Sequence, residues 1–347
     1  MQARKKGFPT GALAAITAPV TDTKLDVLAI GDAVVDVIAD AEDSFLDEEG
    51  LVKGSMRLLD AGEATRLYGK MGPARETSGG SAANTVAGVA ALGGRAGFVG
   101  QVAKDQLGDV FVHDIRAHGV EFDTPPIDGG LPTGRCLILV TPDAQRTMNT
   151  FPGAAHQLSE AALDEEQIKG AVILYLEAYL WRAEGPRSAM RRAVRIAREA
   201  GRQVALTLSD IACIDRHRDD FRGLIDAGEV DMLFANENEL RSLAESDDFD
   251  RALERFGANV PLLVVTCGAK GAIALERGTR RSVTAAPVDK VVDTTGAGDL
   301  FAAGFLAAHA RGKPTEQCLA TGAIAAAEVI SHYGARPQAD LKALAGL

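Results

Sequence analysis

A glycine-rich turn that ends in a carboxylate is the stretch of this 347-residue sequence best suited to chemistry. It runs Asp293-Thr294-Thr295-Gly296-Ala297-Gly298-Asp299, and an apolar pattern with helical spacing follows it directly. The first backbone N–H groups of a helix lack intrahelical partners and carry partial positive charge, so such a turn suits phosphate. Because glycine has no Cβ atom, a bulky anion can approach Gly296 and Gly298 closely.

The carboxylate of Asp299 needs an explanation, because beside an anion site it repels the ligand. We expect Asp299 to accept a proton from a hydroxyl that attacks the phosphoryl group held by the turn. A simpler interpretation is a cap that matches the helix dipole, and residues 293–301 alone favour neither. A helix N-terminus should also keep this carboxylate ionised, which would make it a weak base.

Strands and helices alternate regularly in the second half of the chain, which contains this turn. Alternating strands and helices predict a parallel sheet that is covered on both faces, with ligands beyond the carboxyl ends of the strands. A β-type run at 281–292 leads into the turn, and short β-like runs at 136–141 and 146–151 predict a small second sheet. The alternating strands are expected at 172–176, 203–208, 231–234 and 262–266, with helices at 184–200, 216–227 and 237–243.

Charge and composition exclude several classes of partner. The net charge is −11 and no Lys/Arg-rich block interrupts it, which argues against nucleic acid or an anionic membrane as the main partner. No apolar run reaches transmembrane length. The four cysteines lie far apart without a Cys-x-x-Cys unit, which suits reduced thiols in a cytoplasmic enzyme. Residues 1–20 are expected to be a flexible tail.

A second glycine-rich motif completes a family resemblance. The sequence Ser78-Gly79-Gly80-Ser81-Ala82-Ala83-Asn84 is followed by Phe98-Val99-Gly100-Gln101-Val102. Together with the motif at 293–299, and in this order, it resembles the PfkB family of carbohydrate and nucleoside kinases. The resemblance implies a ribokinase-like three-layer α/β/α sandwich with a mostly parallel central sheet. It also implies one kinase domain over 21–347, into which the segments of a small β-sheet lid, approximately 33–60 and 121–151, are inserted.

The resemblance assigns roles around the acceptor. It makes Asp299 the catalytic base, with Gly296, Ala297 and Gly298 as an anion hole for the transferring phosphoryl group. Asp36 stands at the family's sugar-binding position, and a carboxylate accepting from two neighbouring hydroxyls suits a ribose diol. The alternative for Asp36 is an exposed strand residue. Further positions that match contacts with the same substrate are Gly80, Ser81 and Asn84.

The resemblance also implies ATP and Mg²⁺ as cofactors. Asn236 and Glu239 match an Asn-x-x-Glu motif that organises Mg²⁺ and its waters. The pair alone favours an asparagine cap at a polar helix start, but its place after a strand and beside both motifs favours the metal role. Some members bind a monovalent cation near the Asp293 region and the segment 326–335, so K⁺ stays open. Residues that resemble the turn flanking the nucleotide site are Thr266, Gly268, Lys270 and Gly271.

Within the family, the chain most resembles adenosine kinase-like members, which implies the 5′-hydroxyl of adenosine as acceptor. The stretches that carry this resemblance are Gly79-Gly80-Ser81-x-x-Asn84, the insertion from Phe45 to Leu67, Gln145-Arg146-Thr147-Met148 and Tyr333-Gly334-Ala335. Arg146 matches a lid arginine that contacts phosphate, or is a solvated lid residue. Tyr179, near Tyr175 and Trp181, could stack on a purine or pack in the core. A fructokinase- or ribokinase-like sugar kinase uses the same signatures and is the alternative. A nucleotide-binding regulator without turnover is the alternative from another class. A monomer and a lid-mediated homodimer both remain open.

Overall fold

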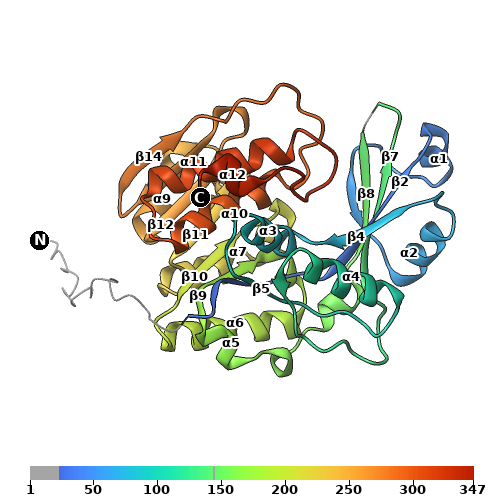
Figure 1. Cartoon of the computed structure of the whole chain (residues 1–347), viewed down its shortest axis with the longest axis horizontal. Coiled ribbons are helices and arrows are strands. Elements are labelled where there is room, and N and C mark those ends of the chain that lie inside the picture. The colour runs from blue at the N-terminus through green and yellow to red at the C-terminus, as the bar shows by residue number, and fades with distance from the viewer. Residues whose placement is uncertain (1–22, 144) are drawn as a thin grey trace, which may run out of the picture.

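The computed structural model describes residues 23–143 and 145–347, so the tail predicted for residues 1–20 lies outside it. The larger of two sheets has nine strands in the order β14-β13-β12-β11-β10-β9-β1-β5-β6 (Figure 1). Neighbouring strands are parallel from β6 to β12, and β13 and β14 are added antiparallel at one edge. The strands of the large sheet are β1 (Leu25–Ile30), β5 (Ala96–Val99), β6 (Val120–Glu121), β9 (Ala171–Glu177), β10 (Gln203–Thr207), β11 (Met232–Asn236), β12 (Leu262–Thr266), β13 (Ala272–Glu276) and β14 (Thr279–Val283).

Helices cover both faces of the large sheet, which confirms the predicted three-layer sandwich. Successive residues of a strand point to opposite faces, so Tyr175 and Leu176 belong to two different apolar clusters. One cluster contains α3 (Ser81–Ala91), α4 (Gln106–Ala117), α10 (Ala297–Ala310), α11 (Thr315–Val329) and α12 (Leu341–Ala345). The other contains α5 (Glu165–Lys169), α6 (Glu184–Glu199), α7 (Ile211–Asp226), α8 (Glu237–Ala244) and α9 (Phe249–Asn259). Short 3₁₀ helices span Gly153–Gln157, Glu160–Ala162, Ala178–Arg182 and Gly268–Lys270.

The smaller sheet stands to one side of the large one and has the order β3-β8-β7-β2-β4 (Figure 1). Its strands are β2 (Val34–Asp40), β3 (Met56–Leu58), β4 (Arg75–Gly79), β7 (Gly134–Val140) and β8 (Arg146–Phe151), and the connecting helices are α1 (Asp43–Glu48) and α2 (Ala61–Tyr68). Val35 and Val37 face a core shared with Leu46 and Leu67 of these helices. The opposite face of β2 therefore carries Asp36. Strand β4 lies outside the two segments that the sequence suggested for this sheet.

Two elements differ from the sequence-based expectation for reasons visible in the structure. The strand expected at 281–292 ends at Val283, because the backbone of the following segment bonds elsewhere: the N–H groups of Val292 and Asp293 both donate to Ile330 O. The helix expected at 216–227 begins earlier, as α7, because the Asp210 side chain accepts from the first N–H groups of that helix. A kink at His217 separates its two halves.

Two expectations from composition can be compared with the described residues. No helix among them is long and apolar enough to cross a membrane. All four cysteines lie in the described part of the chain, where each is a buried free thiol, in agreement with the expected reduced state.

Candidate active site

The turn at 293–299 begins helix α10, as expected. Gly296 is the N-cap with φ 77°, and a Cβ atom there would lie 2.6 Å from the Cβ atom of Ala335, so both backbone and space require glycine. Helix α10 is held in place because it packs on α3 and α11. The N–H of Ala297 is donated to Thr294 O at 3.2 Å. Within the described residues, the N–H groups of Gly296, Gly298 and Asp299 have no acceptor, so these are the donors available to an anion.

The two glycine-rich motifs meet at the side chain of Asp299. Its Oδ1 accepts from Ser81 Oγ at 2.6 Å, and its Oδ2 accepts from Asn84 Nδ2 at 2.9 Å. Both donors lie in the first turn of α3, which packs beside α10. The carboxylate is therefore oriented by two hydrogen bonds before any substrate arrives.

The protonation of Asp299 corrects one sequence-based expectation. The helix N-terminus was expected to keep this carboxylate a weak base. Burial instead raises the pKa of Asp299 above its ordinary value, against the opposing hydrogen bonds from Ser81 and Asn84 and the charge of Arg336. A raised pKa makes the carboxylate a better proton acceptor.

A cavity of about 470 Å³ lies between the strand ends, the α10 turn and the small sheet. It brings together most of the residues that the sequence singled out. Residues at 268, 270 and 271 do not line it, and the side chain of Lys270 is 78% exposed and 3.6 Å from Glu237. Ala297, whose N–H is already bonded, does not line it either. The singled-out residues that do line it are Asp36, Gly80, Ser81, Asn84, Tyr179, Asn236, Glu239, Thr266, Gly296, Gly298 and Asp299.

Asp36 lies on the inner face of the small sheet and also lines an adjoining cavity of about 390 Å³. Burial raises its pKa to about 6, opposed by the positive charges of Arg336 and Arg146 and reinforced by Asp299. A carboxylate with this pKa is ionised at neutral pH and has lost part of its hydration, so hydroxyl donors from a ligand would replace water.

Asn236 and Glu239 form a reciprocal cap at the start of α8. Asn236 Oδ1 accepts from Glu239 N at 2.9 Å, and the two oxygens of Glu239 accept from Asn236 N and Nδ2 at 2.9 and 2.7 Å. The capping interpretation is therefore confirmed as geometry. Burial also raises the pKa of Glu239 to about 7, which a bound cation would lower again.

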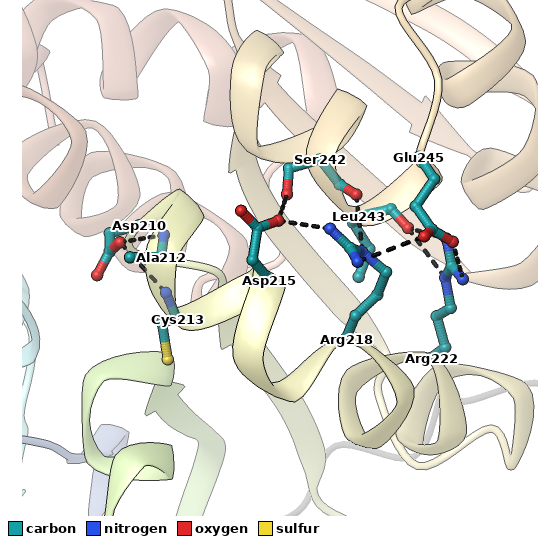
Figure 2. Close-up of polar contacts among 9 residues, drawn as sticks. All are labelled: Asp210, Ala212, Cys213, Asp215, Arg218, Arg222, Ser242, Leu243 and Glu245. Atoms are coloured by element: carbon teal, nitrogen blue, oxygen red, sulfur yellow. Dashed lines mark hydrogen bonds and ion pairs between the residues drawn. The ribbon is translucent and has the colours of Figure 1, made fainter.

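Helix α8 is fixed at its other end by arginines of α7. Arg218 Nε donates to Ser242 O at 3.0 Å and Arg222 Nε to Leu243 O at 2.9 Å (Figure 2). Glu245, in the left-handed conformation, pairs with both arginines. These bonds satisfy the last carbonyl groups of α8, so its N-terminal carboxylate is presented to the cavity by a rigid element.

No group of three or more His, Cys, Asp or Glu side chains able to hold a metal occurs among the described residues. Mg²⁺ keeps several waters and is often bound through one or two carboxylates plus phosphate oxygens. The donor set at Glu239 and Asn236 fits that mode of binding, with the remaining ligands supplied by water and nucleotide.

Of the three aromatic residues that could stack on a purine, only Tyr179 reaches the cavity. Tyr175 and Trp181 are buried in the core. Tyr179 Oη donates to Ser209 O at 3.2 Å, and the guanidinium of Arg182 lies 5.3 Å from its ring centroid. These contacts hold the ring at the cavity wall.

Arg146 reaches across from β8 to the residues just before the α10 turn. Its Nη2 lies 2.8 Å from Asp293 Oδ2, and it lines the adjoining cavity with Asp36 and Asn84. The predicted phosphate contact of Arg146 stays a prediction.

Two charged residues that lie behind the cavity were missed by sequence reasoning. Glu177 is fully buried at the end of β9, where its carboxylate accepts from the N–H groups of Asp32 and Ala82, and burial raises its pKa well above the ordinary value. The signal for Glu177 in the sequence was a carboxylate at the end of an otherwise apolar strand. Arg336 donates to Ser78 O and Ala83 O and places a buried positive charge near Asp36 and Asp299. No local pattern marks it.

Comparison with known proteins now adds to this geometry. The model of the pfkB family of carbohydrate kinases matches residues 24–341. This chain belongs to the pfkB family. Among solved structures of pfkB-like fold, a probable sugar kinase from Rhizobium etli is 45% identical with a TM-score of 0.88, and covers 93% of this chain and 98% of its own. The adenosine kinase from Sinorhizobium meliloti is 48% identical with a TM-score of 0.87, at 93% and 99% coverage.

The curated relatives from the pfkB family are named fructokinases. Fructokinase-1 of Oryza sativa subsp. japonica is 32% identical over 234 residues, which are 66% of this chain and 72% of that protein. The fructokinase of Klebsiella pneumoniae is 29% identical over 282 residues, at 80% and 82% coverage. The chain is thus a carbohydrate or nucleoside kinase of the pfkB family, a phosphotransferase that uses an alcohol as acceptor. The names of its relatives differ in the acceptor alcohol that they imply.

Proposed function

We propose that this kinase transfers the γ-phosphate of ATP to the 5′-hydroxyl of adenosine. Asp299 accepts the hydroxyl proton, and the open N–H groups of Gly296, Gly298 and Asp299 stabilise charge on the transferring phosphoryl group. The proposal places the acceptor between Asp36 and Asp299 and the nucleotide beyond the α10 turn, towards Glu239. Glu239 and Asn236 would hold Mg²⁺ there through water, and the ion would neutralise phosphate charge.

The observation that carries the choice of a nucleoside is an apolar wall on the small sheet. Met56 and Leu58 are 42% and 46% exposed, yet both line the cavity that contains Asp36 and Asp299. Exposed apolar area gains about 25 cal/mol per Å² when a ligand covers it. A purine has a flat apolar face to cover this wall, whereas a free sugar would lay hydroxyl groups against it. Further apolar side chains on the same wall are Val34, Ile138 and Met148.

The polar side of the cavity suits the ribose of the same nucleoside. Asn84 Nδ2 donates to Asp299, while its buried Oδ1 has no hydrogen-bond partner among the described residues. A ribose hydroxyl donating to this oxygen would satisfy it, and the ionised Asp36 would accept from a neighbouring hydroxyl. Asn84 would then join the sugar to the base that acts on it, which orients the 5′-hydroxyl.

The small sheet is proposed to act as a lid over this acceptor. The cavity is walled by both sheets, so movement of the small sheet would open and close it. Closure would exclude water, which otherwise competes with the acceptor for the phosphoryl group.

A sugar kinase is the second candidate, and the 32% identity to a rice fructokinase supports it. A regulator that binds nucleotide without turnover is the third. A pure binder has no use for a carboxylate that two side chains orient beside a phosphate-binding turn.

A panel assay decides among the three. The protein is incubated with Mg-ATP and adenosine, other nucleosides, ribose or fructose, ADP formation is recorded, and mass spectrometry identifies the phosphorylated product. We expect adenosine to be preferred, with AMP as product. Turnover of fructose without adenosine would overturn the acceptor and keep the kinase, and absence of turnover with every acceptor would favour the regulator. The Asp299→Asn variant, purified identically, controls for a contaminating kinase.

A further inference from the structure

Arg146 links the small sheet to the phosphate-binding turn through a nearly buried ion pair. Its Nη2 lies 2.8 Å from Asp293 Oδ2, and the two side chains are 8% and 5% exposed. Its Nη1 donates to Thr295 Oγ1 at 3.4 Å, and its guanidinium lies 5.6 Å from the ring centroid of Tyr333. All three partners belong to the turn or to the C-terminal segment, whereas Arg146 itself belongs to β8 of the small sheet.

Three separate segments contact the carboxylate of Asp293. Its Oδ1 accepts a hydrogen bond from Thr295 N at 3.0 Å, within the turn. Its Oδ2 accepts a hydrogen bond from Gly334 N at 3.0 Å, in the C-terminal segment, and forms the ion pair with Arg146. The carboxylate thus ties together the turn, the C-terminal segment and the small sheet, and its negative charge is met by one positive charge from within the chain.

This arrangement does not fit a free monovalent cation at Asp293, a site that the family resemblance left open. A cation on this carboxylate would lie beside a guanidinium that already occupies Oδ2 and is permanently charged. Like charges so close repel strongly in a site this little exposed to water. Arg146 therefore supplies the positive charge that a bound cation would bring to Asp293.

We propose that Arg146 is a positioning residue that serves as a built-in monovalent cation. When the small sheet covers the site, its guanidinium neutralises Asp293 and fixes the turn whose N–H groups receive the phosphoryl group. The wild-type kinase then needs no K⁺. The proposal rests on phosphoryl transfer at this turn, as proposed above, and not on the identity of the acceptor.

Loss of the arginine side chain has a definite consequence. A buried carboxylate without its partner is strongly unfavourable, so Asp293 would either move or take up a cation from solution. A turn that is no longer held stabilises the transition state less, whereas substrate binding changes little. The value of kcat therefore falls by more than the acceptor KM changes.

The first test compares KCl with choline chloride at equal ionic strength and pH 8, which lies above the pKa of about 6 of Asp36. For the wild type we expect kcat equal within about twofold and an unchanged Tm. For Arg146→Met we expect kcat in choline chloride to be about tenfold lower than that of the wild type in the same salt. KCl should then restore it several-fold and raise Tm by about 2 °C, because K⁺ binds the folded state.

Three variants separate this role from a merely structural one. Arg57→Met removes a lid arginine whose ion pair with Glu63 stays within the small sheet, and it should behave as wild type. Arg146→Lys keeps the charge and should remain independent of K⁺. The double variant Arg146→Met with Asp293→Asn removes the charge that attracts the ion, and the response to K⁺ should disappear.

Activation of the wild type by K⁺ beyond twofold would overturn the proposal, and so would an Arg146→Met variant with unchanged kcat or no response to K⁺. The wild-type comparison needs no variant to fold. The Tm comparison needs no turnover, so a kinase that rejects adenosine still tests the role of Arg146.

Discussion

The turn at the start of α10 and the small sheet contribute to the same cavity in different ways. Asp299 lies on a helix that packs on α3 and α11, and two side chains of α3 already hold its carboxylate. Met56 and Leu58 lie on β3, an edge strand of the small sheet, with over 40% of each residue exposed. The group that would carry the chemistry is thus preorganised, whereas the groups that would select the acceptor still have surface to bury. We infer that substitutions around Asp299 change the rate of turnover and that substitutions on the small sheet change acceptor preference.

The largest effect is expected from Asp299→Asn. Asparagine keeps the shape but is not a base, so turnover should fall about a thousandfold while the affinity for ATP changes only a few-fold. Turnover is measured as ADP formation and ATP binding by calorimetry. Comparable losses of turnover and ATP affinity would assign Asp299 a structural role and would remove the contrast between the two regions.

Asp36→Ala should act on the acceptor alone. A hydrogen bond from a ribose hydroxyl to an ionised carboxylate disappears, so the acceptor KM should rise about a hundredfold. The KM for ATP should change little, because Asp36 lies on the small sheet and not at the α10 turn. An equal rise in both KM values would show that Asp36 shapes the whole cavity.

The apolar wall can be tested with a matched pair of leucines. Leu58 lines the cavity at 46% exposure, and Leu131 is 40% exposed without lining it. Leu58→Gln should lower kcat/KM for adenosine about tenfold by replacing an apolar contact with a polar group, and should affect ribose less. Leu131→Gln should leave both unchanged. Equal losses with adenosine and ribose would mean that the wall does not contact a base.

The smallest expected effect is on pH dependence. Burial raises the pKa of Asp36 to about 6, so the fraction ionised falls by about fourfold between pH 7 and 5.5, and the acceptor KM at saturating Mg-ATP should rise accordingly. The raised pKa also has a cost for stability. The folded state binds more protons than the unfolded state between the two pKa values, so this carboxyl lowers stability as pH rises from about 4 to about 6. Asp36→Asn should flatten the dependence of KM and raise Tm at pH 7. A flat KM in the wild type would contradict this assignment.

Local sequence signals mark some of the residues that line the cavity and miss others. The turn at 293–299 and the motif at 78–84 were recognised because glycines, a carboxylate and a helical pattern lie next to one another in the chain. Asn236 and Glu239 were recognised for the same reason, since a cap uses residues three apart. Lys270 was also singled out, yet its side chain points to solvent, because neighbours in the chain do not determine which side chains of a turn face a cavity.

The alternation of strands and helices in the second half of the chain, the three-layer class and the two glycine-rich turns could be predicted from the sequence, because each depends on spacing within a short segment. The folded chain was needed to show that Ser81 and Asn84 hold Asp299, that Arg146 pairs with Asp293, and that Glu177 and Arg336 lie beneath the site. It also decided that burial raises the pKa of Asp299, whereas the helix terminus alone would have lowered it. Contacts between residues more than a hundred positions apart, and the water that they exclude, depend on how the whole chain packs.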